Sequence, residues 1–346
     1  MKAVVFYEYG PIEVLKHGDV PTPRPSAGEV LMRVRATAVN QSDLMARSGH
    51  PYRPNRSFPH ILGADIAGEV VEVGPGVEDV CVGTPVIAYG TLSCGRCEFC
   101  LAGDTNICLH RGYLGAHVWG GYAQYMKLPA TNAVPFDAAK VSWEAAATLS
   151  QAYLTAWHML VTRAELKPGE DILIHAAGSG LGVAGLQIAK CINARVFATA
   201  GSEEKCERAR QMGADYVINY RIQDFAEEVR RLTGKRGVDV VFEHTGRDTW
   251  DGSVRSLVRR GRLVTCGGTS GYEVTTSAAH IFHKELTLIG SNYGTLNEFR
   301  TIVRLLEREV FSPVVQEVMP LREARRAQRM LEERKAFGKL VLIPEA

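Results

Sequence analysis

The chain has 346 residues, which is enough for two domains that each bury a hydrophobic core. Hydrophobic residues make up 46% and charged residues 23%, as in an ordinary globular protein, so a disordered or low-complexity chain is excluded. The formal net charge is only +2, with acidic and basic residues mixed along the chain, and this gives no basic surface for nucleic acid or an anionic membrane.

The N-terminal segment does not have the pattern of a targeting signal. One early lysine is followed by Glu8, Gly10 and Pro11, which interrupt any apolar run. No later apolar run is long enough to cross a bilayer. We therefore expect a cytoplasmic protein that acts on a small molecule, with neither a nucleic acid nor a membrane as its partner.

Residues 1–150 are expected to form a mostly antiparallel β domain. Short strand-like segments broken by Gly and Pro dominate this region. Residues 29–39 approach the alternation of a half-buried strand, and residues 64–74 are a β-rich run ended by the sequence Gly-Pro-Gly.

The pattern changes near Ser142, which is a plausible N-cap for a helix over 142–160 with Glu144 in its first turn. Strands and helices then alternate, which is typical of a parallel sheet covered on both faces. We expect a doubly wound Rossmann domain over 151–290. Its expected strands are 171–177, 194–200, 215–220, 238–246, 261–268 and 285–291, and its expected helices are 183–190, 203–212, 224–232 and 249–258.

The remaining segment, 291–346, is expected to contain two amphipathic helices and a final strand at 339–344. Because chain termini often lie close together, we expect this segment to complete the first domain. The fold class is therefore α/β, with a parallel Rossmann sheet and a second, mostly antiparallel β domain.

A glycine-rich turn joins the first Rossmann strand to its helix, and we take Gly178, Ser179, Gly180 and Leu181 as cofactor-binding residues. Glycines let the backbone approach a pyrophosphate, and the N-terminus of the following helix offers unpaired N–H groups to it. Residues 180–185 also match G-x-G-x-x-G, so the assignment of each glycine to a role depends on an alignment shift of one residue.

The end of the second Rossmann strand favours NADPH over NADH. NAD enzymes usually have an acidic residue there to bind the ribose 2′-hydroxyl, whereas residues 199–202 read Thr-Ala-Gly-Ser. Ser202 and Lys205 suit a 2′-phosphate instead. The alternative is that Lys205 is an ordinary solvated lysine near Glu203 and Glu204.

Four of the eight cysteines, Cys94, Cys97, Cys100 and Cys108, lie within fifteen residues, in a lobe at about 91–110. Their spacing matches a closed tetrahedral zinc site with four thiolate ligands. An iron–sulfur cluster also uses four cysteines, but nothing else in the chain suggests electron transfer. We expect one structural zinc.

With both signals present, the chain resembles the medium-chain dehydrogenase/reductase superfamily over its whole length. The residues that carry the resemblance are Gly63-x-Asp65-x-x-Gly68-Glu69-Val70, the four-cysteine lobe, Gly121-Tyr122-Ala123-Gln124-Tyr125, the LTAW helix and the HAAGSGLG turn. The resemblance implies a GroES-like catalytic domain. Where zinc alcohol dehydrogenases of the superfamily have their three catalytic metal ligands, this chain has Asn40, Ala64 and Gln151, so the catalytic zinc is expected to be absent.

These positions resemble the quinone oxidoreductase branch instead. Further matches are Asn40-x-x-Asp43, Arg47-Ser48-Gly49, Gly246-Arg-Asp-Thr-Trp250, and the pair Lys205 and Tyr220, which in that branch help to hold the NADPH 2′-phosphate. The four-cysteine lobe is a departure, because typical quinone oxidoreductases lack it. The resemblance also implies a homodimer or homotetramer, with the strand at 285–291 as a pairing edge.

Without a catalytic metal, hydride transfer requires an acceptor that is already electrophilic, such as a quinone or an α,β-unsaturated carbonyl. We expect Asn40 and Tyr52 at the substrate oxygen and Thr155 beside the nicotinamide. Each also has an ordinary interpretation, as a turn cap, a loop aromatic and a buried helix residue. Asp43 is expected to hold a loop rather than act as a base.

The histidines His60, His117 and His158 are more simply interpreted as packing residues than as metal ligands. An atypical catalytic metal on His60, Asp43 or Asp65 is one alternative, and it would make the chain an unusual zinc alcohol dehydrogenase. A second alternative is a non-catalytic protein that binds NADPH.

Overall fold

The computed structural model describes residues 1–50 and 57–345, and the chain divides into two compact units. The first unit combines Met1–Gln151 with Thr295–Ala346, and the second is Ala152–Gly294. The sequence pattern predicts these divisions after residues 150 and 290. Among the described residues, no helix has the length and apolar character needed to cross a membrane.

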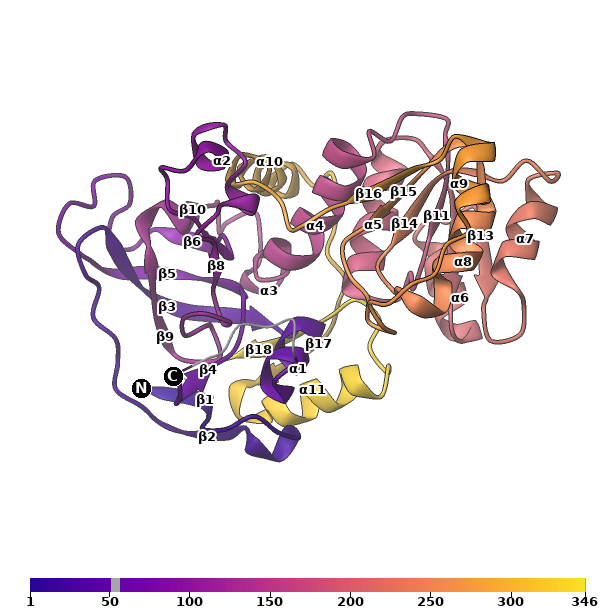
Figure 1. Ribbon diagram of the computed structural model, residues 1–346. Coiled ribbons are helices and arrows are strands. Elements are labelled where there is room, and N and C mark those ends of the chain that lie inside the picture. The colour runs from indigo at the N-terminus through magenta and orange to yellow at the C-terminus, as the bar shows by residue number, and fades with distance from the viewer. Residues whose placement is uncertain (51–56, 346) are drawn as a thin grey trace. The chain divides into compact units, whose positions relative to one another are not determined.

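The first unit is built on an antiparallel sheet whose centre is β3 (Glu29–Ala38). Its strand order is β10-β6-β5-β3-β18-β17, and β9 also pairs with β3 (Figure 1). Among the described strands of this sheet, only β17 and β18 pair in parallel. The other strands of this sheet are β5 (Asp65–Val73), β6 (Pro85–Ala88), β9 (Tyr125–Pro129), β10 (Ala133–Pro135), β17 (Val315–Pro320) and β18 (Lys339–Ile343).

In the described part of the first unit, two smaller sheets and several helices complete the fold. A three-stranded sheet has the order β2-β1-β4, and β7 pairs with β8. The strands are β1 (Lys2–Phe6), β2 (Lys16–Asp19), β4 (His60–Ile61), β7 (Thr91–Leu92) and β8 (Gly112–Tyr113), and the helices are α1 (Gln41–Ser48), α2 (Glu98–Leu101), α3 (Trp143–Ala146), α10 (Leu296–Glu307) and α11 (Ala324–Glu332).

The C-terminal segment completes the first unit, as predicted, because β18 lies between β3 and β17. The sequence analysis did not predict β17. Its burial alternates weakly and the apolar Val318 is exposed, so its short sequence has little apolar periodicity to reveal a strand. The helix α1 was also missed. It is held by the buried Arg47, whose guanidinium donates to Gln328 and Glu332 of α11.

The second unit confirms the predicted Rossmann fold. Its six strands are all parallel, in the order β13-β12-β11-β14-β15-β16. From β11 the chain adds β12 and β13 on one side of the sheet and then β14 to β16 on the other, so the strand order reverses between β11 and β14. The strands are β11 (Asp171–Ile174), β12 (Arg195–Ala200), β13 (Tyr216–Asn219), β14 (Val238–Glu243), β15 (Leu257–Thr265) and β16 (Thr287–Gly290).

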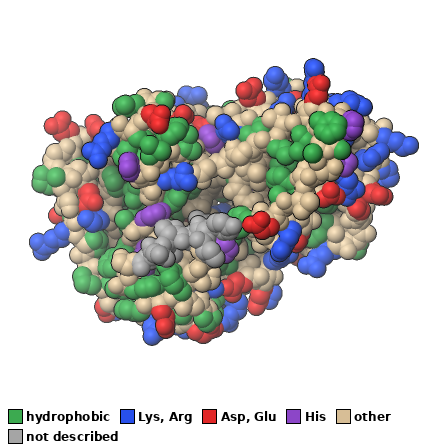
Figure 2. Space-filling view, in the orientation of Figure 1, with side chains coloured by type: hydrophobic (Ala, Val, Ile, Leu, Met, Phe, Trp, Pro, Cys, Tyr) green, Lys and Arg blue, Asp and Glu red, His purple; other side chains and the backbone are tan. Residues whose placement is uncertain are grey.

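Helices cover both faces of this parallel sheet, with α4 packed on α5 and α7 packed on α8. The helices are α4 (Leu154–Trp157), α5 (Gly180–Cys191), α6 (Glu203–Gln211), α7 (Phe225–Leu232), α8 (Arg247–Ser256) and α9 (Ala278–Lys284). Apolar side chains of the strands and of α7 and α8 form a buried cluster in this unit. The surface view shows acidic and basic side chains interspersed, in keeping with the small net charge (Figure 2).

The helix predicted over 142–160 is interrupted rather than continuous. Its N-cap is confirmed, because the Ser142 hydroxyl accepts a hydrogen bond from the Ala145 N–H at 3.2 Å. Wide π-helical turns follow at Leu149–Tyr153 and His158–Arg163. At the first of these, the Gln151 N–H donates to the carboxylate of Asp65 at 2.6 Å. A backbone donor directed to a side chain is withdrawn from the regular helical ladder, which accounts for the widened turn.

Candidate active site and structural metal site

Three neighbouring strands of the first unit bring Asn40, Asp65 and Lys339 together. Asp65 begins β5 opposite Ala38 at the end of β3, and Asn40 follows that end by two residues. The strand β18 runs antiparallel to β3 on its other side, so Lys339 at its start also lies near the end of β3. Strand order therefore assembles a polar cluster from residues far apart in sequence.

The centre of this cluster is a buried ion pair. The Lys339 ammonium lies 2.8 Å from Asp65 Oδ2 and donates to Asn40 Oδ1 at 2.5 Å. Asp65 is fully buried and Lys339 is 5% exposed. The second oxygen of Asp65 accepts the Gln151 N–H, so the carboxylate has partners on both oxygens. A paired and hydrogen-bonded charge of this kind is tolerated in a protein interior, whereas either charge alone would be strongly destabilising.

Asn40 is held in this cluster by all of its side-chain atoms. Its amide nitrogen donates to Asp65 Oδ2 at 3.0 Å and to the Ala38 carbonyl at 3.2 Å, while its amide oxygen accepts from Lys339. Both amide N–H groups are therefore occupied within the protein. A direct hydrogen bond from Asn40 to a substrate oxygen would require one of them to be released, so that role stays a prediction.

The other two predicted catalytic residues are placed differently. Tyr52 lies outside the described residues. Thr155 is in α4 of the second unit, where its side chain is partly exposed, while Leu154 and Ala156 on either side of it are buried. Its predicted role beside a nicotinamide is not tested by this placement.

Asp43 is a buried carboxyl group that holds the loops around it. It accepts hydrogen bonds from the backbone N–H groups of Asn40 and Gly63 and from the Tyr122 hydroxyl. Burial raises the pKa of Asp43 to about 6 despite these donors. Its contacts fit the loop-holding role that the sequence analysis preferred to a role as a base.

His60 is likewise held by packing and by a hydrogen bond. Its ring lies edge-on to Phe6, and its Nε2 is 3.1 Å from the Gly115 carbonyl oxygen. Within the described part of the chain, His60, Asp43 and Asp65 do not form a group close enough to share a metal ion.

In the second unit, the predicted glycine-rich turn lies between β11 and α5. Helix α5 begins at Gly180, and its N-cap is Ser179, whose hydroxyl accepts from the Gly182 N–H at 2.9 Å. A Cβ atom on Gly182 would lie 2.2 Å from the Ala176 carbonyl oxygen, so only glycine permits this close approach. The unpaired N–H groups at the start of this 12-residue helix fit a dinucleotide phosphate.

The predicted reader of the 2′-phosphate lies at the end of β12. Ser202 is the N-cap of α6 and accepts from the Lys205 N–H at 3.3 Å, so these two residues share one helical turn. A Cβ atom on Gly201 would lie only 2.4 Å from the Tyr220 hydroxyl oxygen, so this tyrosine packs closely against the end of β12. The structure thus brings Ser202, Lys205 and Tyr220 to the same strand end.

The sequence analysis did not single out two residues of these sites. Arg221 follows Tyr220, and its guanidinium lies 6.0 Å from the centre of that ring, which adds a cation near the end of β12. Its position beside Tyr220 was a usable signal. Lys339 had only the weak signal of a charge at the start of an apolar strand, and its partner is 274 residues away.

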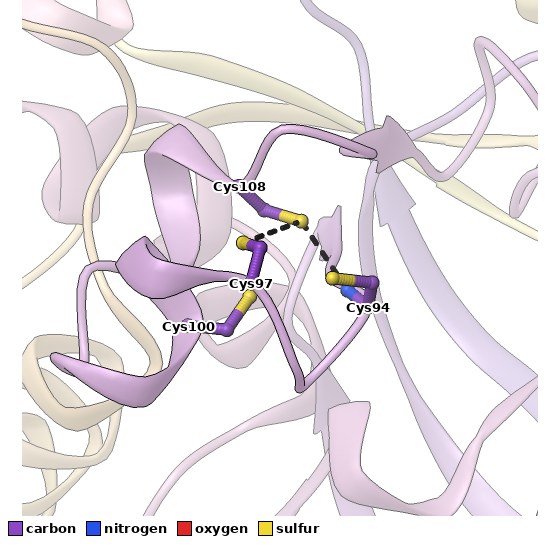
Figure 3. A group of neighbouring side chains, drawn as sticks. All are labelled: Cys94, Cys97, Cys100 and Cys108. Carbon is purple, nitrogen blue, oxygen red and sulfur yellow. Dashed lines mark hydrogen bonds between the residues drawn. The ribbon is translucent and has the colours of Figure 1, made fainter.

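The four cysteines converge as predicted. Their sulfur atoms all lie within 4.8 Å of one another, on the loop that contains α2 and the segment after it (Figure 3). Within the residues that the structure describes, no other group of three or more Cys, His, Asp or Glu side chains is close enough to hold a metal. Cys108 is buried, and its sulfur accepts backbone N–H groups from Cys94 and His110 at 3.3 Å.

The chemistry of this donor set fits a zinc ion. Backbone N–H groups, chiefly that of Leu109, lower the pKa of Cys97 to about 6. Burial and the neighbouring thiols raise the pKa of Cys100 to about 11. Four thiols this close resist ionising together unless a cation offsets their charge, and a divalent metal with four sulfur ligands does this.

Comparison with known proteins places both units in established families. Residues 26–138 match the family model for the alcohol dehydrogenase GroES-like domain, and residues 180–308 match that for zinc-binding dehydrogenases. The chain is 32% identical to an NAD-dependent alcohol dehydrogenase of Saccharolobus solfataricus, covering 99% of this chain and 100% of the relative. It is also 32% identical to a quinone oxidoreductase of Salmonella typhimurium, covering 99% of each chain.

A solved structure supports the same assignment. The crystal structure of an NAD-dependent alcohol dehydrogenase has 45% sequence identity and a TM-score of 0.93, and the match covers 99% of each chain. The similar proteins therefore include some named alcohol dehydrogenase, at 32% and 45% identity, and one named quinone oxidoreductase, at 32% identity.

Proposed function

The chain belongs to the medium-chain dehydrogenase/reductase superfamily and is an NAD(P)H-dependent oxidoreductase, and from this premise we propose a more specific activity. We propose that it is an NADPH-dependent reductase that transfers hydride to a quinone or an α,β-unsaturated carbonyl without a catalytic metal. The observation that carries the proposal is the buried Lys339 ammonium among the positions where zinc alcohol dehydrogenases of the superfamily bind their metal.

The three positions, Asn40, Ala64 and Gln151, offer few ligand atoms for a cation. Ala64 has no ligand atom, and the Asn40 side chain is already bonded to Lys339 and Asp65. The Gln151 backbone donates to Asp65 as well. A divalent ion there would face the fixed positive charge of Lys339 at close range, and the carboxylate nearest to it is already neutralised. These contacts favour chemistry that needs no Lewis acid at this place.

Hydride transfer without a metal requires an electrophilic acceptor. NADPH, held by the glycine-rich turn and the end of β12, would supply a hydride, which is two electrons and one proton, to an oxygen of the quinone or to the β-carbon of the unsaturated carbonyl, and would leave as NADP⁺. A proton from solvent completes the reduced product, a hydroquinone or a saturated carbonyl, so electrons and atoms balance. Simple alcohols fit less well, because their oxidation requires an alkoxide that a metal usually stabilises.

The end of β12 supports NADPH as the cofactor. Lys205, Arg221 and the Ser202 hydroxyl supply positive charge and a hydrogen-bond donor, and no carboxylate replaces them at the end of the strand. Glu203 and Glu204 in the first turn of α6 act in the opposite direction, although Glu203 is paired with Arg210 at 3.0 Å. The relatives named NAD-dependent make NADH the competing cofactor.

The four-cysteine lobe is proposed to hold a structural zinc. All four positions of a tetrahedral ion would be taken by thiolates, so no position is left for substrate or water. The zinc would stabilise the loop at 94–108 and take no part in hydride transfer.

The test combines a metal count with substrate turnover. We would measure zinc per chain in purified protein and follow NADPH absorbance with a quinone, an enone and an enoyl thioester. A matched assay would follow NADP⁺ or NAD⁺ reduction with primary and secondary alcohols. The expected result is about one zinc per chain, and turnover of at least one electrophilic acceptor.

Two other results would replace the proposal. About two zinc ions per chain, with alcohol oxidation that is lost on chelation, would identify a zinc alcohol dehydrogenase with atypical ligands. Tight binding of NADPH with no turnover of any acceptor or alcohol would identify a non-catalytic nucleotide-binding protein.

A further inference from the structure

A buried chain of polar side chains crosses the second unit beneath the glycine-rich turn. It consists of Glu243 at the end of β14, Ser253 in α8, His175 just after β11 and Thr199 in β12. Each of the four is at most 2% exposed. None of them has a role in the proposed hydride transfer, and buried polar groups of this number are retained in a core only when they bond to one another.

The carboxylate of Glu243 fixes the direction of the hydrogen bonds. One of its oxygens accepts the backbone N–H groups of Thr245 and Gly246, at 2.7 and 3.0 Å. The other accepts the hydroxyls of Thr249 and Ser253, at 2.8 and 2.7 Å. Four donors on its two oxygens compensate the burial of the carboxylate charge. Glu243 is therefore an ionised acceptor.

From Glu243 the chain of donors runs in one direction. Because the single hydroxyl proton of Ser253 goes to Glu243, its oxygen must accept a proton from His175 Nε2, which lies 2.8 Å away. Burial lowers the pKa of His175 to about 4, so its ring is neutral and carries its proton on Nε2. His175 Nδ1 then accepts from the Thr199 hydroxyl at 3.3 Å.

The far end of this chain is the peptide that opens the glycine-rich turn. The Thr199 hydroxyl oxygen accepts the Ala176 N–H at 3.2 Å. Ala176 has a φ of +46°, in the left-handed region that an alanine adopts only when its surroundings hold it there. The Ala176 carbonyl accepts the Ser179 N–H at 2.8 Å, and it is the group that approaches Gly182 so closely. The shape of the turn thus depends on the orientation of Ala176.

We propose that Glu243, Ser253 and His175 are positioning residues for dinucleotide binding, which act by holding Ala176 in the left-handed conformation that shapes the turn. The inference rests on the proposed function, because it assumes that this turn receives the dinucleotide phosphates. The hydrogen bonds of the chain polarise one another, and loss of one member leaves its neighbours unpaired in a buried place. The turn then loses the arrangement in which its N–H groups face a phosphate.

Helix α8 offers a matched pair of variants. Ser253→Ala interrupts the chain, whereas Ser256→Ala removes a buried hydroxyl on the same helix that only donates to the Gly252 carbonyl at 2.7 Å. Both substitutions remove one oxygen from a fully buried serine. Only the Ser253 hydroxyl belongs to the series of hydrogen bonds that ends at the Ala176 N–H.

The readout is the dissociation constant of NADPH, by fluorescence titration, with kcat at saturating NADPH measured beside it. We expect Ser253→Ala to weaken NADPH binding about tenfold, which corresponds to about 1.4 kcal/mol, and to leave kcat within about twofold. Ser256→Ala is expected to bind NADPH like the wild type. Ser253→Thr, which restores the hydroxyl, is expected to recover most of the affinity.

A second variant and a spectroscopic signature guard against misfolding of Ser253→Ala. Thr199→Val removes the hydroxyl at the other end of the chain with little change of shape, and we expect the same loss of NADPH affinity. In ¹⁵N correlation spectra, the wild-type His175 ring is expected to stay neutral with its proton on Nε2 down to about pH 5. Ser253→Ala is expected to change this tautomer signal.

The outcomes separate this inference from the proposed function. Wild-type protein that binds NADPH, together with unchanged affinity in Ser253→Ala and Thr199→Val, would overturn the positioning role alone. Equal loss of affinity in Ser256→Ala would show a merely structural effect of the helix and would overturn it too. Wild-type protein that binds neither NADPH nor NADH would overturn the proposed function, and this inference with it.

Discussion

Burial changes the chemistry of single side chains in this protein, and Asp43 is a clear case. Its carboxyl group is 3% exposed and has three donors, yet its pKa is raised to about 6 from an ordinary value of 3.8. The energy lost on removing the charge from water therefore exceeds what these donors return. Asp43 binds the backbone N–H groups of Asn40 and Gly63, but its buried charge lowers the free energy of unfolding near neutral pH.

Asp43→Asn should reveal this effect through pH. Because the folded protein keeps the Asp43 proton between pH 3.8 and about 6 while the unfolded chain has released it, the wild type loses stability as pH rises through that window. The variant has no such charge, so its free energy of unfolding relative to the wild type should rise by about 2 kcal/mol between pH 4 and pH 7. Urea unfolding at several pH values measures this.

Asp137→Asn is a suitable control for that experiment. Asp137 is exposed, and hydrogen bonds from the Ala139 N–H and Lys140 lower its pKa. The stability of this variant relative to the wild type should fall slightly as pH rises, which is the opposite sign. A pH-independent difference for Asp43→Asn would show that folding does not raise the pKa of Asp43.

Cofactor choice is also a property of single residues. Lys205→Ala removes a positive charge in the first turn of α6, and we expect NADPH to bind about tenfold more weakly while NADH affinity is unchanged. Titration of both cofactors measures the ratio. Lys16→Ala, an exposed lysine in β2 of the first unit, is the control and should change neither affinity. An unchanged preference in Lys205→Ala would show that Lys205 does not read the 2′-phosphate.

Single elements show what a local sequence can and cannot hold in place. Residues 94–108 of the lobe contain only a four-residue helix, α2, and a 3₁₀ turn, and Leu101 in this segment and Leu109 just after it are mostly exposed. So little apolar burial cannot order a loop of this length. The cluster of four sulfur atoms supplies the missing cross-link when a metal is bound.

Cys97→Ser should loosen this lobe without removing hydride transfer. We expect the zinc content to fall from about one per chain towards zero and the melting temperature to fall by several degrees, with NADPH oxidation retained below the transition. Cys191→Ser, an exposed cysteine outside the lobe, should change neither zinc content nor melting temperature. Loss of turnover in a folded Cys97→Ser protein would mean that the zinc takes part in catalysis.

At the scale of the whole molecule, the first unit is closed by its last strand. The ion pair between Asp65 and Lys339 joins β5 to β18 across 274 residues, and the cluster also includes Gln151 at the end of the unit's first segment. A buried ion pair need not add net stability, but loss of one partner leaves a buried charge uncompensated. The pair therefore makes closure of the unit depend on both segments.

Lys339→Met should destabilise the protein by about 3 to 5 kcal/mol, because Asp65 stays buried without its cation. The double variant Asp65→Asn with Lys339→Met should recover much of that loss, since neither charge remains. Chemical denaturation of both variants measures the coupling. Lys2→Met, which breaks an exposed pair with Asp19, should change stability by less than about 1 kcal/mol. Equal losses in the single and double variants would show that the pair is not coupled.

The sequence by itself determined much of this protein, because the signals concerned are local. Alternation of strands and helices predicted the Rossmann unit, and its six-stranded parallel sheet confirms the prediction. The turn after β11 and the four cysteines were visible from spacing, since the atoms that must meet there are separated by few residues. Ser142 as an N-cap is of the same kind.

Only the tertiary structure decided what depends on contacts between distant segments. Lys339 meets Asp65 and Asn40 because β18 lies beside β3. Glu243 of β14 reaches Thr199 of β12 through Ser253 in α8 and His175 just after β11. The helix after Ser142 widens because a carboxylate 86 residues away takes a backbone proton donor from it. Buried polar groups must find partners wherever the fold provides them, and local spacing does not specify those partners.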